Sequence, residues 1–347
     1  MVVGVCQVLQ PSSTSPMSDV RPAENLIVVV VDGFRWQELF EGADHELLGS
    51  IDGPAGEINR LLYDAPTSQE RRALLLPFFW KVISRQGQLI GNRGFGSRVN
   101  TTNLYQLSYP GYNEMFTGNA DILISSNKKQ RNPHANVFEQ LNSLDGFRGR
   151  VVAFTSWDVF PYILNEHRNG LLVNSGYEPT NDTSSAELRL LDQLQQRTMR
   201  GRAGTRYDEL TFVAAKEYMA VHHPRVVLLG LGETDEYAHQ GRYDLYLHHA
   251  NKTDRMLAEL WHWIQQTPGY ANRTNLLITT DHGRGRRDKN WSSHGSFIAG
   301  SSETWIALMG PGVSPRGEHQ RSEQYYQAGI AQLITALLGQ EYDLGKR

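Results

Sequence analysis

The chain has 347 residues, long enough for one large α/β domain with a sizeable core. Its 34 Lys and Arg residues nearly balance 37 Asp and Glu residues, and a net charge of −3 excludes the basic field that nucleic-acid binding requires. No apolar run approaches the roughly 20 residues of a membrane span, and the one cysteine, Cys6, excludes an intramolecular disulfide and a Cys-based metal cluster.

Residues 1–24 contain a short apolar stretch, Val2–Leu9, followed by a segment rich in Ser and Pro. We predict a disordered tail here, or the remnant of a processed signal peptide, although the basic start of a signal peptide is missing.

The first predicted core strand is Asn25–Val31, whose continuous run of β-branched residues is typical of a central parallel strand. Further apolar runs predict strands at Gln88–Asn92, Val151–Phe154, Arg225–Leu231, Asn275–Ile278 and Thr304–Met309. Periodic apolar residues predict helices at Leu74–Arg85, Pro110–Thr117, Ala135–Leu144, Ser184–Arg200, Thr211–Val221, Asp244–Gln265 and Glu323–Leu338. Strands separated by helices predict an α/β fold with a doubly wound, mostly parallel central sheet flanked by helices.

Residues 156–210 are polar and poor in strand signals. We expect them to form an inserted cap laid over the sheet rather than part of it. No linker divides the rest of the chain, so residues 25–347 are predicted to form a single catalytic domain with this cap inserted.

The first candidate ligands are Asp281 and His282, which follow the predicted strand Asn275–Ile278 after Thr279-Thr280. A carboxylate and an imidazole at the carboxyl end of a buried strand are poor core residues. They are both good ligands for Zn²⁺. The glycines on either side of Arg284 let the chain turn away from them.

Further residues of the same chemical types follow other predicted strands, where ligands of α/β sheets bind. Asp32 follows the first strand, Asp235 follows Arg225–Leu231, His239 lies one helical turn after Asp235, and His294 follows in the loop after Asp281. Together they make six ligands, enough for two three-ligand sites that each keep an open position. That pattern is typical of catalytic rather than structural zinc.

Ser108 is the candidate nucleophile. It precedes the predicted helix Pro110–Thr117, whose amino end favours an anion. No Gly-x-Ser-x-Gly motif surrounds Ser108, which argues against an α/β-hydrolase triad. A cation bound at its oxygen lowers the hydroxyl pKa, so no separate histidine base is needed. The alternative is that Ser108 only caps the helix.

Several short motifs resemble the alkaline phosphatase superfamily and follow its chain order. They are Asp32-Gly33-Phe34-Arg35, Ser108-Tyr109-Pro110 with Thr117-Gly118, Asp235 with His239, Asp281-His282-Gly283, His294-Gly295 and Gly310-Pro311-Gly312-Val313. The nucleotide pyrophosphatase/phosphodiesterase branch looks most similar, because it has the first motif and a downstream Asn-Lys like Asn127-Lys128. That branch uses threonine where this chain has Ser108.

The resemblance implies two Zn²⁺ ions. One would be held by Asp32, Asp281 and His282 with Ser108 bound to it, and the other by Asp235, His239 and His294. It also implies that Asn127 contacts a phosphoryl oxygen and that the protein is extracytoplasmic, periplasmic or secreted, while a cytoplasmic location stays open.

We therefore expect a two-metal hydrolase of small-molecule phosphate esters that works through a phosphoseryl intermediate. Trp157, Phe160 and Tyr162 offer an aromatic surface and favour diesters, whereas His167 and Arg168 would suit a phosphomonoesterase. A sulfate-ester hydrolase is disfavoured because the x-Pro-x-Arg pattern of sulfatases lacks its arginine here. A catalytically silent binder of a phosphorylated ligand stays open, as does the oligomeric state.

Overall fold

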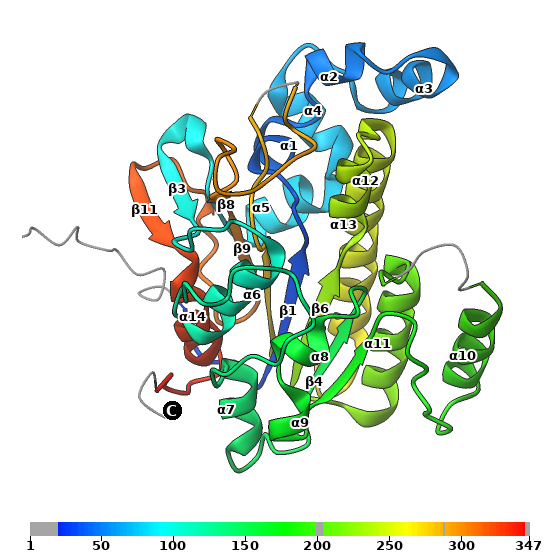
Figure 1. Cartoon of the computed structure of the whole chain (residues 1–347), viewed down its shortest axis with the longest axis vertical. Helices are drawn as coiled ribbons and strands as arrows, with labels where there is room; N and C mark the ends of the chain where they lie inside the picture. Colours follow the sequence, from blue (N-terminus) through cyan, green and yellow to red (C-terminus); the bar gives the residue numbers. More distant parts are fainter. Residues whose placement is uncertain (1–19, 199–203, 287–288, 344–347) are drawn as a thin grey trace, which may run out of the picture.

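The computed structural model describes residues 20–198, 204–286 and 289–343 (Figure 1). Within these residues, eight strands form a central sheet in the order β10-β2-β9-β7-β1-β6-β4-β5. Their bounds are β1 Asn25–Val31, β2 Gly87–Ile90, β4 Val151–Thr155, β5 Leu172–Ser175, β6 Val226–Leu231, β7 Thr274–Thr279, β9 Ile306–Met309 and β10 Gly317–Glu318. The five strands β7-β1-β6-β4-β5 are mutually parallel, and β9 is antiparallel to both β7 and β2. The predicted mostly parallel α/β sheet is confirmed.

A smaller sheet lies beside the central one. It is built from β3 Ser97–Asn100, β8 Glu303–Thr304 and β11 Glu323–Tyr326, in the order β11-β3-β8.

The centre of the large sheet is buried on both faces. Every residue of β1, β6 and β7 is buried, which is why their sequences are continuous apolar runs without alternation. Successive side chains of β1 enter different cores: Ile27, Val29 and Val31 pack on one face. Leu26 and Val28 pack with Val30 on the other.

Helices cover both faces (Figure 1). One core receives side chains from α1 Trp36–Glu41, α2 His45–Gly49, α4 Ser68–Leu75, α11 Asp208–His222 and α13 Tyr243–Gln266. The other receives side chains from α6 Ser108–Thr117, α7 Val137–Ser143, α8 Phe160–Ile163 and α14 Ile330–Ala336. The remaining helices are α3 Gly53–Tyr63, α5 Ser84–Gln86, α9 Glu166–Asn169, α10 Ala186–Thr198 and α12 Glu233–His239. Among the described residues, none of the helices combines the length and the apolar composition needed for a membrane span.

Two predicted helices are wrong in part. The predicted helix Leu74–Arg85 is interrupted, because α4 ends at Leu75 and Pro77 cannot continue an α-helix. A π-helical turn, Phe79–Ile83, follows, and the carboxylate of Asp254 accepts the backbone N–H groups of Phe78 and Phe79. The predicted helix Glu323–Leu338 begins instead with strand β11, since Glu323–Tyr326 pairs with Ser97–Asn100, and helix α14 starts only at Ile330.

Two domain boundaries also need correction. Strand β5, inside the predicted cap 156–210, pairs with β4 and so belongs to the central sheet. Residues 20–24, assigned to the tail, are attached to the domain, since Arg21 N donates to Gly312 O and Ala23 N donates to Leu337 O. Residues 1–19 of the predicted tail lie outside the described residues.

Candidate metal centre and nucleophile

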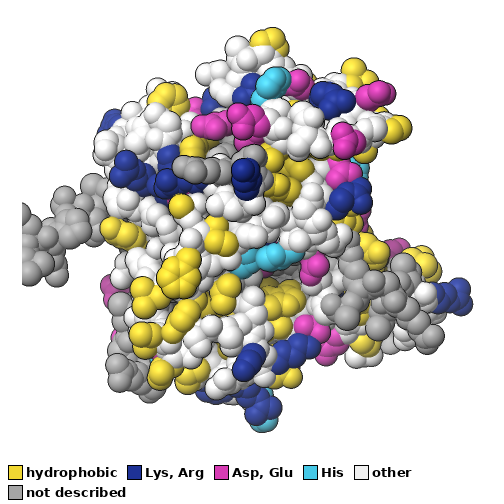
Figure 2. Space-filling model, turned by 45° about the horizontal axis from the view of Figure 1, so that its top comes forward, with side chains coloured by type: hydrophobic (Ala, Val, Ile, Leu, Met, Phe, Trp, Pro, Cys, Tyr) yellow, Lys and Arg dark blue, Asp and Glu magenta, His cyan; other side chains and the backbone are white. Residues whose placement is uncertain are grey.

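The candidate ligands meet at the carboxyl edge of three neighbouring strands. Asp32 directly follows β1, Asp281-His282 follows β7, and Asp235 lies on α12, which begins two residues after β6. Strand β1 lies between the other two, so the three strand ends bring together residues far apart in the sequence. In the view of the top of the molecule, histidine side chains are exposed near the middle of the face (Figure 2).

Three oxygen atoms of the first group lie at similar distances from His282 Nε2. His282 Nε2 lies 3.5 Å from Asp32 Oδ1, 3.4 Å from Asp281 Oδ2 and 3.2 Å from Ser108 Oγ. Ser108 Oγ lies 3.5 Å from Asp32 Oδ1. Ligands about 2.0–2.1 Å from a tetrahedral Zn²⁺ stand about 3.3 Å apart. The spacing therefore fits one such ion.

The carboxylates of this group are crowded and lack a compensating charge. Asp281 Oδ1 accepts the backbone N–H of Gly33, but Asp281 Oδ2 is buried without a hydrogen-bond partner among the described residues. Burial, with added repulsion from Asp235, raises the pKa of Asp281 to about 7. Burial and then the charges of Asp281 and Asp235 raise the pKa of Asp32 well above its usual value. A cation between them relieves both penalties.

The second group is formed by Asp235, His239 and His294. His239 Nε2 lies 3.1 Å from Asp235 Oδ2 and 3.1 Å from His294 Nε2. His294 Nε2 is 3.9 Å from Asp235 Oδ1. The side chain of His239 is 50% exposed, so this end of the centre is open to solvent. The structure thus brings together all six residues predicted as ligands.

The two groups adjoin one another. The rings of His282 and His294 stack with centroids 3.8 Å apart and planes 9° from parallel. Asp235, His282 and His294 also offer one close set of ligand atoms, so His282 lies between the two groups.

Backbone carbonyls orient both buried imidazoles. His294 Nδ1 faces Gln106 O at 2.9 Å, and His282 Nδ1 faces Gly283 O at 3.0 Å. Because a carbonyl only accepts, each Nδ1 carries the proton and each Nε2 presents a lone pair to the centre. Burial, then the neighbouring His282, lowers the pKa of His294 to about 2, which keeps it neutral as a ligand must be.

Arg284 is a site residue that the sequence did not reveal as one. Its buried guanidinium donates from Nη1 to Asp235 Oδ1, from Nε to Trp291 O and from Nη2 to Ser292 O. Burial raises the pKa of Asp235, but Arg284 and then the hydrogen bond with His239 outweigh burial, so the pKa lies well below its usual value. Asp235 therefore stays ionised and has one oxygen left for a cation. The only hint of this role in the sequence was that Arg284 lies three residues after Asp281.

Ser108 is the first residue of α6, and its hydroxyl faces the first group of ligands. Leu107 is the N-cap residue of α6, so the alternative that Ser108 only caps this helix is wrong. A Cβ on Gly111 would lie 2.5 Å from Asp281 O, so glycine is needed for α6 to approach the metal centre this closely.

Asn127 lies beside the amino end of α6. Its Oδ1 accepts the backbone N–H of Tyr109 at 2.9 Å, which leaves its amide N–H groups as donors next to Ser108. The structure therefore places Asn127 next to the candidate nucleophile.

Two further positioning residues were missed. Tyr112 lies one helical turn after Ser108, and its hydroxyl donates to Asp32 Oδ2 at 3.0 Å. Gln106 has a φ of 51°, an unfavourable left-handed conformation for this residue, and so presents its carbonyl to His294. Asn103 Oδ1 holds that conformation by accepting Gln106 N at 2.7 Å.

Most of the side chains predicted to form an aromatic and cationic substrate surface in the cap have structural contacts instead. Phe160 is buried in the core against Tyr112, and Trp157 packs against the same core. Arg168 binds Glu139 and the carbonyl oxygens of Asn132, Pro133 and His134, so it has a structural role.

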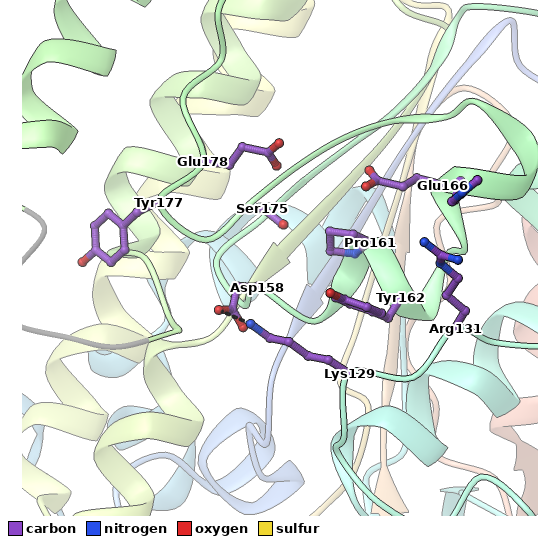
Figure 3. Close-up of a pocket in the computed structure, with 10 residues that line it drawn as sticks. Lys129, Arg131, Asp158, Pro161, Tyr162, Glu166, Ser175, Tyr177 and Glu178 are labelled. Atoms are coloured by element: carbon purple, nitrogen blue, oxygen red, sulfur yellow. Dashed lines mark hydrogen bonds and ion pairs between the residues drawn. The ribbon is translucent and has the colours of Figure 1, made fainter.

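Tyr162, the third aromatic residue of that predicted surface, lines a cavity of about 620 Å³ (Figure 3). The other lining residues are Lys129, Arg131, Asp158, Pro161, Glu166, His167, Ser175, Tyr177 and Glu178.

Comparison with protein-family models and with curated proteins finds no match. Solved structures do match over most of the chain. The Thermus thermophilus alkaline phosphatase aligns with a TM-score of 0.57 at 13% identity, over 99% of this chain and 97% of its own. The Listeria monocytogenes lipoteichoic acid synthase LtaP aligns with a TM-score of 0.59 at 11% identity, over 92% of this chain and 73% of its own. A putative sulfatase from Bacteroides thetaiotaomicron aligns with a TM-score of 0.57 at 12% identity, over 93% and 72%.

The chain is therefore an α/β protein with an Asp/His/Ser cluster at the carboxyl edge of its sheet. Its fold is similar to those of solved alkaline phosphatases and of a protein in the alkaline phosphatase superfamily from Vibrio parahaemolyticus.

Proposed function

We propose that this chain is a two-zinc hydrolase of phosphate esters, with Ser108 as the nucleophile and a preference for diesters. The observation that carries the proposal is that Asp32 Oδ1, Asp281 Oδ2 and Ser108 Oγ all lie 3.2–3.5 Å from His282 Nε2. Asp32, Asp281 and His282 would hold one zinc ion, and Asp235, His239 and His294 the other. Bound zinc supplies positive charge that stabilises the serine alkoxide and the leaving oxygen.

The residues around Ser108 are suited to handle a phosphoryl group. Ser108 Oγ attacks phosphorus, the alcohol leaves, and the resulting phosphoserine is cleaved by water. The positive amino end of α6 favours the anionic phosphoryl oxygens. Asn127, whose Oδ1 is held by Tyr109 N, would donate its amide N–H to one of those oxygens.

The charges of Arg168 and Lys129 are already neutralised by carboxylates, which favours diesters over monoesters. A monoester brings further anionic oxygens that call for extra cations, but Arg168 is bound to Glu139 and neighbouring carbonyls. Lys129 is paired with Asp158 at 2.6 Å. This arrangement supports the likeness to the nucleotide pyrophosphatase/phosphodiesterase branch, and by that resemblance we also propose an extracytoplasmic location.

Sulfate-ester hydrolysis is the second candidate, because sulfatases are among the similar folds. A turnover panel on zinc-loaded protein separates the candidates, using bis-p-nitrophenyl phosphate, p-nitrophenyl phosphate and p-nitrophenyl sulfate. We expect the highest kcat/KM for the diester. A higher value for the sulfate would replace the proposal with a sulfatase, and no turnover of any ester by protein with bound zinc would indicate a silent binder.

A further inference from the structure

Three loop segments beside the metal centre carry exposed apolar side chains, which we call the apolar rim. Its members are Leu104, Ile122, Leu123 and Phe297. Leu104 and Ile122 are each 63% exposed, Leu123 is 84% exposed, and Phe297 is fully exposed. Single exposed leucines are common on protein surfaces, whereas several large apolar side chains gathered in one place usually mark a binding site.

Direct contacts hold the three segments beside one another. The hydroxyl of Tyr105 donates to Ile122 O at 2.6 Å and joins the first segment to the second. A Cβ on Gly295 would lie 4.0 Å from Tyr105 O, so the third segment lies against the first. Ile298 N donates to Gly295 O and closes the turn that carries Phe297. The rim is therefore built from neighbouring loops.

The rim borders the metal centre. Gln106 O, two residues after Leu104, lies 2.9 Å from His294 Nδ1, and Phe297 lies three residues after His294. Two residues of chain span at most about 7 Å and three at most about 10 Å. Leu104 also lies four residues before Ser108. Figure 2 shows hydrophobic side chains gathered next to the exposed histidines on this face. The rim therefore starts at the edge of the second ligand group.

The metal centre opens to solvent on the side of the rim. His239 is 50% exposed, and its Nε2 lies 3.1 Å from His294 Nε2. A diester with its phosphorus at Ser108 has two alcohol substituents, and a long one must extend out through this opening. The rim side chains have no charged or hydrogen-bonding group, so only an apolar substituent gains from lying on them. Such a substituent removes apolar area from water on both partners.

We propose that the apolar rim binds a long hydrocarbon substituent of the ester substrate, so that the substrate is an amphiphilic phosphodiester. The inference rests on the proposed hydrolase function and adds a substrate class to it. The chain extends from phosphorus at Ser108 over Leu104, Leu123 and Phe297. At about 1.25 Å per carbon, from C–C bonds of about 1.5 Å, an octyl chain is roughly 10 Å long and reaches from the ligand groups to the rim.

The test compares p-nitrophenyl octyl phosphate with p-nitrophenyl ethyl phosphate, each below the concentration at which it aggregates. Full burial of a methylene is worth about fourfold in affinity, so contact on one side of the chain is worth about twofold. Six additional methylenes should therefore raise kcat/KM of the zinc-loaded protein roughly 60-fold. The double variant Leu123→Ser/Phe297→Ser should lose most of that preference. Leu61→Ser is the matched control, since Leu61 is 85% exposed on α3, and should keep the preference.

The other possible occupants of the rim give different results. Equal kcat/KM for the two esters would overturn the inference and leave the hydrolase function intact. A gain for the octyl ester that appears only above its aggregation concentration would replace the single substrate chain with a lipid surface. Light scattering checks for a second copy of the chain. A dimer that dissociates in Leu123→Ser/Phe297→Ser would assign the rim to subunit contact instead.

Binding separates failure of this inference from failure of the proposed function. Calorimetry on zinc-loaded Ser108→Ala compares the affinities of octyl phosphate and ethyl phosphate without turnover. If neither diester is hydrolysed, the proposed function fails, but tighter binding of octyl phosphate that is lost on adding Leu123→Ser/Phe297→Ser still supports the rim. Equal binding of the two compounds overturns it. Phe297→Ser alone, at a fully exposed position, repeats the test if the double variant does not fold.

Discussion

Replacing Arg284 with methionine tests the charge balance of the second ligand group. The guanidinium is buried and bonded to Asp235, Trp291 O and Ser292 O, whereas the Asp235 side chain is 17% exposed. Removing one partner of a buried ion pair costs about 3–5 kcal/mol. For 347 residues the unfolding entropy is about 0.7 kcal/mol per degree, so the loss corresponds to a fall of about 4–7 °C in Tm.

Bound zinc should reduce that loss, because a cation at Asp235 replaces the missing guanidinium charge. Thermal melts of Arg284→Met in chelator and in zinc measure both values against the wild type. Arg148→Met is the control, since Arg148 is 73% exposed and only 4.0 Å from an exposed Asp145, and its Tm should change by less than about 1 °C. An unchanged Tm without metal, or an equal fall with and without zinc, would refute the reasoning.

Three further predictions concern the nucleophile, the metals and pH. Ser108→Ala should lose most ester turnover yet keep its zinc by elemental analysis, while Ser108→Thr should keep part of the activity; near-normal rates in Ser108→Ala would mean that water attacks directly. Elemental analysis should find two zinc ions per chain and one in Asp281→Asn, and a single ion in the wild type would contradict the two-site assignment. Burial raises the pKa of Asp254 to about 7. Between about pH 4 and pH 7 the folded state therefore keeps a proton that the unfolded chain has released. The free energy of unfolding should fall by up to about 4 kcal/mol as the pH rises from about 4 to about 7. The Tm of Asp254→Asn should vary less between pH 5 and 8 than that of the wild type, and equal slopes would exclude Asp254 as the source.

The central strands were predictable because a strand buried on both faces has a continuous run of apolar residues. The valines of β1 and the Val-Val-Leu-Leu run of β6 can hardly be solvent-exposed. Strand β5 was missed because Leu172–Ser175 is a short edge strand, with Leu172 itself 40% exposed. Short edge strands carry little hydrophobic pattern for a prediction to use.

The candidate ligands were predictable because parallel strands end at one edge, so polar residues after each strand must meet there. The residues that form hydrogen bonds with those ligands were not predictable from the sequence. Arg284 bonds Asp235 across 49 positions, and Gln106 presents a carbonyl through a left-handed backbone. Phe160 and Arg168 were misassigned because side-chain direction, not composition, decides whether a residue faces core, neighbour or ligand.

The position of β1 has a consequence for biosynthesis. Leu26 pairs with Val226 on one side and with Asn275 on the other, about 200 and 250 positions later in the chain. At about 5–20 residues per second, the first strand emerges roughly 10–50 s before its neighbours are complete. During that interval four consecutive valines, Val28–Val31, have open hydrogen-bonding edges on both sides. We therefore expect the yield of folded protein to depend on whether chaperones protect this strand while the rest of the chain is being synthesised.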